Sequence, residues 1–183
     1  MNMTNEEEII PVSAHIELRA TDERYTTELH NLVVKNRAWL QDSLNWPQFV
    51  GTEDDTRQNI LSNQMLHQRG YAKMFLIFSD NALVGVLSFN AIEPLNKTGY
   101  IGYWLDEGHQ GQGILSRALE AFIRHYAGRG EIRRFVIKCR VDNAASNQVA
   151  RRNGFLLEGC LKEAEFLNGR YDDQNIYARI CTS

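Results

Sequence analysis

The chain has 183 residues, 43% of them hydrophobic, and its 20 lysines and arginines against 23 aspartates and glutamates give a formal net charge of −3. This length and composition predict a single domain over 1–183, with a disordered tail at 1–8. The acidic balance argues against a nucleic-acid partner, and the shortness of every apolar run argues against a membrane partner.

The first third of the chain predicts a short strand followed by helices. Apolar and polar residues alternate over 16–19, which favours a strand. Apolar side chains then recur at helical spacing, and Thr21 or Asp22 is the expected cap of that helix. Thr52 precedes acidic residues in the first turn of a further helix, which Gly70 ends.

The middle of the chain predicts three strands and a long helix. Two apolar runs, 74–78 and 83–89, flank a turn at 79–81 and are typical of a hairpin. Aromatic and β-branched residues over 98–105 predict a third strand. From 113 to 127 the apolar residues recur at helical spacing instead.

The last third predicts a strand at 135–141, a short helix at 146–153, and an antiparallel pair formed by 155–166 and 171–180. The resulting order is β-α-α-β-β-β-α-β-α-β-β. This order predicts an α/β fold with a mixed, mostly antiparallel sheet flanked by helices, and it lacks the regular alternation of a doubly wound nucleotide-binding fold.

The three cysteines, Cys139, Cys160 and Cys181, are odd in number and widely spaced. This pattern suits neither a disulfide framework nor a zinc site, and the sequence shows no other cluster with metal-ligand spacing. We therefore expect no metal, and a reducing, cytoplasmic location.

A glycine-containing turn lies between the predicted strand 98–105 and the helix that follows it. The turn reads Gln110-Gly111-Gln112-Gly113. Glycines allow close approach of a ligand to the backbone, and the free N–H groups of a helix's first turn bind anions. The spacing matches neither a Walker A loop nor a dinucleotide fingerprint, so a turn that needs glycine only for its geometry is the alternative.

A second motif, over 143–155, begins Asn143-Ala144-Ala145-Ser146 and ends Gly154-Phe155. Together with the glycine turn, and in the same order and separation, it resembles the paired motifs of the GNAT acetyltransferase family. The resemblance covers nearly the whole chain and implies the GNAT fold, with acetyl-CoA as acyl donor.

The resemblance also implies a cofactor-binding set. The backbone of the strand end would bind the pantetheine arm, the backbone of the turn and first helical residues would bind the pyrophosphate, the second motif would surround the reactive end, and an arginine in it would contact a phosphate. These residues are Tyr103, Trp104 and Leu105; Gln110, Gly111, Gln112, Gly113, Ile114 and Leu115; Asn143 and Ser146; and Arg152.

Three further segments, 39–47, 67–73 and 135–143, are similar to the branch of this family that acetylates the N-terminal serine of the bacterial ribosomal stalk protein. This similarity implies an N-alpha-acetyltransferase with that N-terminus as acceptor, and homodimerisation is a family expectation. The alternatives are another amine or protein N-terminus as acceptor, or an acyl-CoA-binding module without catalysis.

The general acid differs from the usual family pattern. Ala150 stands where many members carry a tyrosine that protonates the leaving thiolate. Ser146 lies one helical turn earlier and is the candidate replacement. The alternative is that Ser146 serves only as the N-cap of its short helix.

A carboxylate is the candidate general base, because an α-amine with a pKa near 8 needs only modest help to lose its proton. Glu165 is flanked by apolar residues near the end of a late strand, and the resemblance indicates the same residue. An outward-facing, ion-paired glutamate is the alternative reading. Glu163 and Glu158 are the further candidates.

The remaining aromatic and histidine residues are open to two readings. Trp39, Trp46 and Phe49 suit either the core or the acceptor groove. His109, beside the glycine turn, is expected to be exposed.

Overall fold

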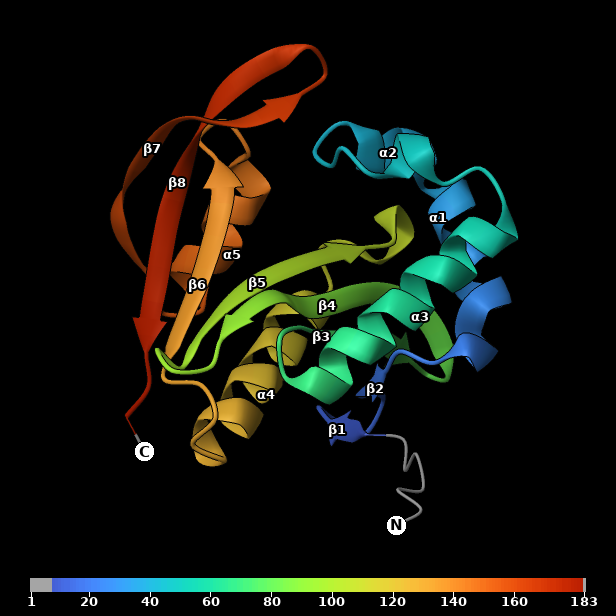
Figure 1. Ribbon diagram of the computed structural model, residues 1–183, viewed down its shortest axis with the longest axis horizontal. Coiled ribbons are helices and arrows are strands. Elements are labelled where there is room, and N and C mark those ends of the chain that lie inside the picture. Colours follow the sequence, from blue (N-terminus) through green and yellow to red (C-terminus); the bar gives the residue numbers. More distant parts are fainter. Residues whose placement is uncertain (1–7, 183) are drawn as a thin grey trace.

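The structure is a computed structural model that describes residues 8–182, and its centre is one eight-stranded sheet with the order β1-β2-β3-β4-β5-β6-β8-β7 (Figure 1). All neighbouring strands are antiparallel except β5 and β6, which are parallel. The strands are β1 Ile9–Pro11, β2 Ile16–Ala20, β3 Lys73–Ser79, β4 Ala82–Glu93, β5 Thr98–Leu105, β6 Arg134–Arg140, β7 Leu156–Leu167 and β8 Arg170–Ile180.

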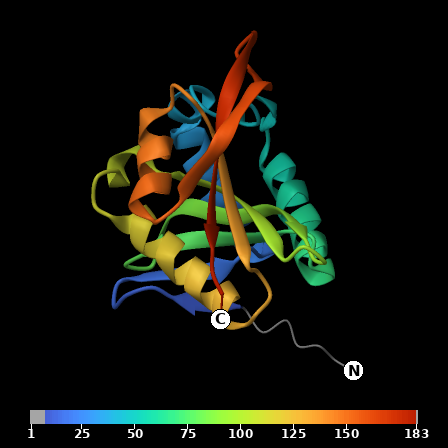
Figure 2. The same cartoon turned by 90° about the vertical axis from the view of Figure 1, so that its left-hand side faces the viewer.

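Helices cover both faces of the sheet, and Figure 2 shows them on its two sides. On one face α1 and α3 pack against β3 and β4 around Leu29, Ile60 and Leu76. On the other, the apolar stripe of α4 packs on the sheet around Phe122 and Phe89. The helices are α1 Thr26–Lys35, α2 Arg37–Gln41, α3 Glu53–Arg69, α4 Ile114–Gly128 and α5 Ala144–Arg152.

The helix ends follow the predicted caps closely. Asp22, one of the two expected caps, accepts the backbone N–H of Arg24 at the start of a short 3-10 turn, Glu23–Tyr25, that leads into α1. Thr52 and Asp55 form a reciprocal capping box at the start of α3. Gly70 ends α3 in the left-handed region with φ 78°, a conformation that glycine adopts without steric cost.

Strand β1 was not predicted. It has only three residues, of which Ile10 alone is buried, so it is too short to display an alternating pattern. The predicted tail lies largely outside the described residues. Its last residue, Glu8, accepts hydrogen bonds from Tyr126 at 3.1 Å and contacts His67 at 2.8 Å, which ties the start of β1 to α3 and α4.

Two further short 3-10 turns, Pro47–Phe49 and Glu107–His109, connect the longer elements. Within residues 8–182 no helix is both long enough and apolar enough to cross a membrane.

Candidate active site

Strands β5 and β6 pair over only about half of their length and then separate. The two parallel strands pair only over Thr98–Ile101 of β5 and Arg134–Ile137 of β6. Beyond these pairs β6 continues along β8, while β5 continues along β4, so the two strands diverge. The second halves of β5 and β6 therefore face each other across an opening in the sheet, which Figure 1 shows near the upper end of β6.

A cavity of about 630 Å³ occupies this opening. Its walls come from the diverging ends of β5 and β6, from the start of α5, from the β7–β8 pair and from the segment after α2. Of the residues predicted to bind or transfer the acyl group, these line it: Tyr103, Trp104, Leu105, Gln110, Leu115, Asn143, Ser146 and Glu165.

The backbone of β5 offers free polar groups to this cavity. Asp106 N–H donates to the carbonyl of Val84 at 2.7 Å, and Leu105 lies opposite Gly85. Because N–H groups alternate sides along an antiparallel ladder, the N–H groups of Leu105 and Tyr103 then face away from β4 and toward the opening. An extended ligand arm can bind there as an added strand.

The glycine turn leads directly into α4. Gly111 and Gly113 have φ of 76° and 74°, and no side chain caps the helix whose first residue is Ile114. Residues 111–113 are exposed, whereas the Ile114 side chain is buried. The N–H groups at the start of α4 are therefore free of side-chain caps and accessible, which is the arrangement that binds a phosphate.

Buried polar contacts hold the turn against the fold. The side chain of Gln110 donates to the carbonyl of Leu105 at 3.1 Å. Asp106, only 1% exposed, contacts Asn36 at 2.8 Å, His109 at 2.7 Å and Lys35 at 3.2 Å. Burial acts to raise the pKa of Asp106, and these hydrogen bonds and the charge of Lys35 outweigh it and lower the pKa to about 2.

His109 was expected to be simply exposed, but its ring is held by the buried carboxylate of Asp106.

The two arginines near the turn differ in their surroundings. Arg152 is exposed in the last turn of α5 and is not part of the cavity wall. The guanidinium of Arg117 instead lies over Gly113, 3.6 Å from where a Cβ would stand. Sequence reasoning missed Arg117, although its position one turn into α4 was a usable signal.

Helix α5 begins two residues before the predicted start. Asn143 is its N-cap and accepts the backbone N–H of Ser146 at 3.1 Å. The alternative that Ser146 serves as the N-cap is therefore wrong, because the preceding asparagine does so. The Ser146 side chain is left to line the cavity, where its hydroxyl lies 2.9 Å from that of Tyr103.

Glu165 lines the same cavity from β7 and is half-buried. Its Oε2 accepts a 2.7 Å hydrogen bond from the side-chain amide of Gln174 on β8. The pairing of β7 with β8 is irregular between Leu161 and Glu165, so Glu163 does not simply share its face. Glu163 is exposed, and its backbone N–H donates to Asp173. Gln174 was not anticipated, because only the strand register brings it to Glu165.

Glu158, the last carboxylate candidate, takes part in a surface ion pair. Its carboxylate receives two hydrogen bonds from the guanidinium of Arg134, and these contacts lower its pKa. It is not among the residues of the cavity wall.

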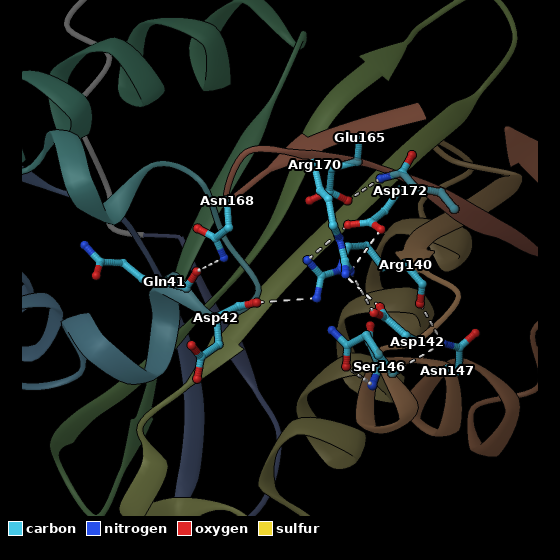
Figure 3. A network of polar contacts seen from close by, with 12 residues as sticks. Gln41, Asp42, Arg140, Asp142, Ser146, Asn147, Glu165, Asn168, Arg170 and Asp172 are labelled. Carbon is cyan, nitrogen blue, oxygen red and sulfur yellow. Dashed lines mark hydrogen bonds and ion pairs between the residues drawn. The ribbon is translucent and has the colours of Figure 1, made fainter. Parts of the chain in front are cut away.

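A ring of charges lies beside Glu165, and two of its members, Arg140 and Asp142, line the cavity (Figure 3). Arg140 of β6 lies 3.3 Å from Asp142 and 3.7 Å from Asp172. Arg170 at the start of β8 lies 3.5 Å from Asp142 and 3.1 Å from Asp172. Two positive and two negative side chains thus alternate between the end of β6 and the start of β8, where Asp172 is the strand partner of Glu165.

The same network reaches across to the segment after α2. Arg140 donates to the carbonyl of Asp42 at 3.5 Å, and Asn168 in the β7–β8 turn donates to the carbonyl of Gln41 at 3.1 Å, as Figure 3 shows. These two contacts connect the opposite walls of the cavity at its outer end.

A second cavity of about 250 Å³ lies on the face covered by α1 and α3. It shares Leu44, Asn90, Gly102, Tyr103 and Trp104 with the first cavity, so the two meet at β5. Its other lining residues are all uncharged: Leu29, Val33, Trp46, Val50, Thr56, Asn59, Asn63, Met74, Val86 and Ser88.

Where the cavities meet, the side chain of Asn90 lies directly over Gly102. A Cβ at Gly102 would stand 2.3 Å from the Asn90 amide nitrogen. Ser88 donates a 2.8 Å hydrogen bond to the amide oxygen of Asn90 and so fixes its orientation. Asn90 sits at the register shift between β4 and β5, a bulge that redirects its side chain.

The aromatic residues before α3 divide between the two cavities. Trp39 is 40% exposed and lines the larger cavity, whereas Trp46 lines the smaller one, 6.1 Å from the Trp104 ring. Phe49 is 73% exposed and belongs neither to the core nor to a cavity wall.

The opening between two parallel strands of a mixed sheet is thus bordered by the uncapped start of α4 and by the side chains of Ser146 and Glu165. A sequence model of the acetyltransferase (GNAT) domain matches residues 15–156, and the chain belongs to the GNAT acetyltransferase family. The expected fold is thereby confirmed. Among residues 8–182 no group of three His, Cys, Asp or Glu side chains is arranged to bind a metal.

Within this family, the chain is similar to acetyltransferases that modify ribosomal proteins. The chain is 66% identical to the ribosomal-protein-serine acetyltransferase of Escherichia coli (strain K12), over 96% of this chain and 98% of that one. The structure is similar to that of RimL, a ribosomal L7/L12 alpha-N-protein acetyltransferase solved with coenzyme A, with TM-score 0.93, 66% identity, and coverage of 94% of this chain and 98% of that one. It is also similar to the microcin C7 self-immunity acetyltransferase MccE with acetyl-CoA and AMP, with TM-score 0.90, 42% identity, and coverage of 92% and 94%.

Proposed function

We propose that this protein transfers the acetyl group of acetyl-CoA to the α-amine of the N-terminal serine of ribosomal protein L7/L12, the stalk protein. The observation that carries the proposal is the meeting of two cavities at Tyr103 and Trp104, in a chain 66% identical over almost its full length to a ribosomal-protein-serine acetyltransferase. One cavity suits the donor, and the other suits the acceptor.

The residues of the larger cavity fit acetyl-CoA. Of the expected N–H groups from Gln110 to Leu115, that of Gln110 donates to the carbonyl of Glu107 at 3.4 Å, and those from Gly111 to Leu115 are proposed to bind the pyrophosphate. The guanidinium of Arg117 adds a positive charge beside Gly113. The edge of β5 that faces away from β4 binds the amide-rich pantetheine arm through its backbone. Arg152 remains a weaker candidate for a phosphate contact, because its exposed side chain lies outside the cavity wall.

Glu165 is the proposed general base. Its carboxylate is half-buried in the cavity, and the hydrogen bond from Gln174 fixes one of its oxygens. It takes a proton from the acceptor ammonium, directly or through one water, and the neutral amine attacks the thioester carbonyl. The backbone N–H of Leu105, which faces the opening, stabilises the oxyanion that develops on that carbonyl oxygen.

Ser146 is the proposed acid for the leaving group. Its backbone is fixed by Asn143, and its hydroxyl lines the cavity across from Glu165 on β7. Collapse of the tetrahedral intermediate expels the CoA thiolate, which takes the hydroxyl proton, and the second proton that the acceptor nitrogen loses as the amide forms restores the serine hydroxyl through cavity water. Base and acid thus come from different elements that bound the same cavity.

The smaller cavity is the proposed acceptor chamber. None of the described residues in its wall is charged, so an acidic or basic side chain placed there would lose its hydration without a partner. Ser88 and Asn90 give it polar groups at its junction with the donor cavity. An acceptor whose first residue has a small hydroxyl side chain, such as serine, would fit this uncharged but partly polar lining.

We also propose that the chain forms one catalytic domain, works in the cytoplasm, and associates as a homodimer. The described cysteines are free thiols, as a reducing compartment allows. Exposed apolar side chains on the β7–β8 pair, including Leu156, Leu157 and Phe166, support self-association. Sedimentation equilibrium tests the proposed homodimer, and a purely monomeric protein at micromolar concentration would contradict it.

The proposed function is tested by mass spectrometry after incubation with acetyl-CoA and synthetic peptides. The peptide with the L7/L12 N-terminal sequence should gain one acetyl group at its α-amine, and the same peptide with a blocked α-amine should gain none. A matched peptide that starts with alanine should react at least about tenfold more slowly, since the polar groups of the chamber are then unpaired.

Two results would contradict the proposal in different ways. Transfer to a small amine or an unrelated N-terminus, but not to the serine peptide, would identify a different acceptor on the same catalytic site. Tight acetyl-CoA binding without transfer to any amine would indicate an acyl-CoA-binding module.

A further inference from the structure

Ser146 by itself is a weak proton donor, because an aliphatic hydroxyl holds its proton far more tightly than a thiol does. Helix α5 supplies no phenol, since Ala150 occupies the position at which many family members carry a tyrosine, and it is fully buried. A phenol reaches Ser146 from the opposite wall instead. The hydroxyl of Tyr103 on β5 lies 2.9 Å from Ser146 Oγ.

Both hydroxyls are held by regular structure. Side chains alternate along β5, so Tyr103 projects to the face covered by α4 and α5, where it packs against the main core. Ser146 lies in the first turn of α5, and Asn143 fixes its backbone N–H. The Tyr103–Ser146 contact is thus a product of strand and helix packing, and both residues line the donor cavity.

We propose that Tyr103 is a positioning residue that acts through Ser146, passing its phenolic proton to the serine oxygen as the serine protonates the leaving thiolate. The inference rests on the proposed acetyl transfer. The C–S bond of the thioester breaks, an S–H bond forms with the proton from Ser146, and the Tyr103 proton restores the serine hydroxyl. The acceptor nitrogen loses a second proton as it becomes an amide, and this proton returns through cavity water to the phenolate. The first proton, taken from the ammonium before attack, goes to solvent through Glu165.

The protonation state of Tyr103 suits this role. Burial raises the pKa of its phenol to about 12, although the hydrogen bond with Ser146 partly opposes the rise. The phenol therefore carries its proton throughout the pH range in which an α-amine with a pKa near 8 becomes neutral. Each turnover begins with the hydroxyl pair fully protonated.

The test is a double-mutant cycle with Tyr103→Phe, Ser146→Ala and the double variant. The control is Tyr100→Phe, on the same strand, whose hydroxyl donates to Glu93 at 2.6 Å and lies outside both cavity walls. Release of the CoA thiol is followed with the serine peptide and with a second amine acceptor. Because the relay serves the leaving group, the same losses are expected with either acceptor, and a wrong acceptor assignment would leave this result intact.

We expect Ser146→Ala to lower kcat about 100-fold and Tyr103→Phe about tenfold, both with little change in the KM for acetyl-CoA. The double variant should be no slower than Ser146→Ala, and the solvent deuterium isotope effect on kcat should fall in Tyr103→Phe but persist in Tyr100→Phe. Additive losses in the double variant, or a Tyr103→Phe effect confined to KM, would overturn the relay and leave Tyr103 a packing residue.

Discussion

The side-chain amide of Asn36, after α1, donates a 2.8 Å hydrogen bond to the buried carboxylate of Asp106, which directly precedes the turn leading to α4. The amide oxygen of Asn36 also accepts the backbone N–H of Glu107 at 3.0 Å. One asparagine therefore joins α1, on the side of the proposed acceptor chamber, to the loop proposed to bind the pyrophosphate.

Asp106→Asn tests this connection. The substitution removes the charge that pairs with Lys35 and His109, and we expect it to lower the free energy of unfolding at pH 7 by about 2 kcal/mol and to raise the KM for acetyl-CoA. The native pKa of about 2 lies below the ordinary value of 3.8, so this stabilisation is complete above about pH 4 and is lost as the pH falls toward 2. Urea unfolding of both proteins at pH 7 and near pH 2 measures it, and an equal difference at the two pH values would argue against a role for the charge.

Glu165→Gln tests the general base. We expect kcat to fall about 100-fold at neutral pH, because general base catalysis is lost while the shape and the contact with Gln174 are retained. The deficit should shrink as the pH rises above 8, where the acceptor α-amine loses its proton unaided. Initial rates from pH 6 to 9.5 give the profile. Glu163→Gln, in an exposed neighbour, should stay within about twofold of the native rate, and the reverse pattern would assign the base to Glu163.

Gly113→Ala tests the phosphate-binding turn. Gly113 has φ 74°, where a residue with a Cβ is strained by about 1 kcal/mol. We expect a displaced turn and about a tenfold higher KM for acetyl-CoA, from the loss of about one hydrogen bond to the pyrophosphate. Gly128→Ala, at the end of the same helix with open space around it, is the matched control and should leave KM unchanged. Calorimetric titration with CoA measures affinity directly, and equal affinities of the two variants would remove the turn from cofactor binding.

Glu8→Gln tests a stabilising contact far from the site. Burial acts to raise the pKa of Glu8. The hydrogen bonds from His67 and Tyr126, together with the nearby charge of Lys73, outweigh burial and lower this pKa to about 2. We expect a loss of about 1–2 kcal/mol at neutral pH, with unchanged kcat. The loss should disappear as the pH falls from about 4.5 to about 2, where the native carboxylate is also protonated. Glu28→Gln, at an exposed helix position, is the control, and equal thermal shifts in both variants would refute the contact.

Much of the fold is predictable from sequence because its elements have strong local signals. The strand 98–105 and the α3 boundaries at Thr52 and Gly70 coincide with the structure, since aromatic runs, a capping box and a left-handed glycine act locally. The start of α5 was placed two residues late, because both Asn143 and Ser146 are good caps and only the structure shows which one accepts the hydrogen bond.

The site itself was only partly predictable. Glu165 and Ser146 were selected by chemistry and resemblance, and the structure brings them to one cavity. That cavity exists because β5 and β6 stop pairing after Ile101, which depends on long-range register and has no local signal. The side chains of Tyr103 and Gln174 acquire their neighbours only through long-range packing, so sequence reasoning does not assign them the roles now proposed. Arg117 differs, because its contact with Gly113 is local to one helical turn.

The close approach of Asn90 to Gly102 constrains how this protein can change over evolutionary time. A methyl group at position 102 would stand 2.3 Å from the Asn90 amide nitrogen, so the Asn90 side chain would have to shift and its hydrogen bond with Ser88 would be disturbed. The effects of substitutions at the two positions are therefore expected to be non-additive, so the order in which they mutate matters. We therefore expect substitutions at the junction of the two cavities to be tolerated in pairs more readily than singly.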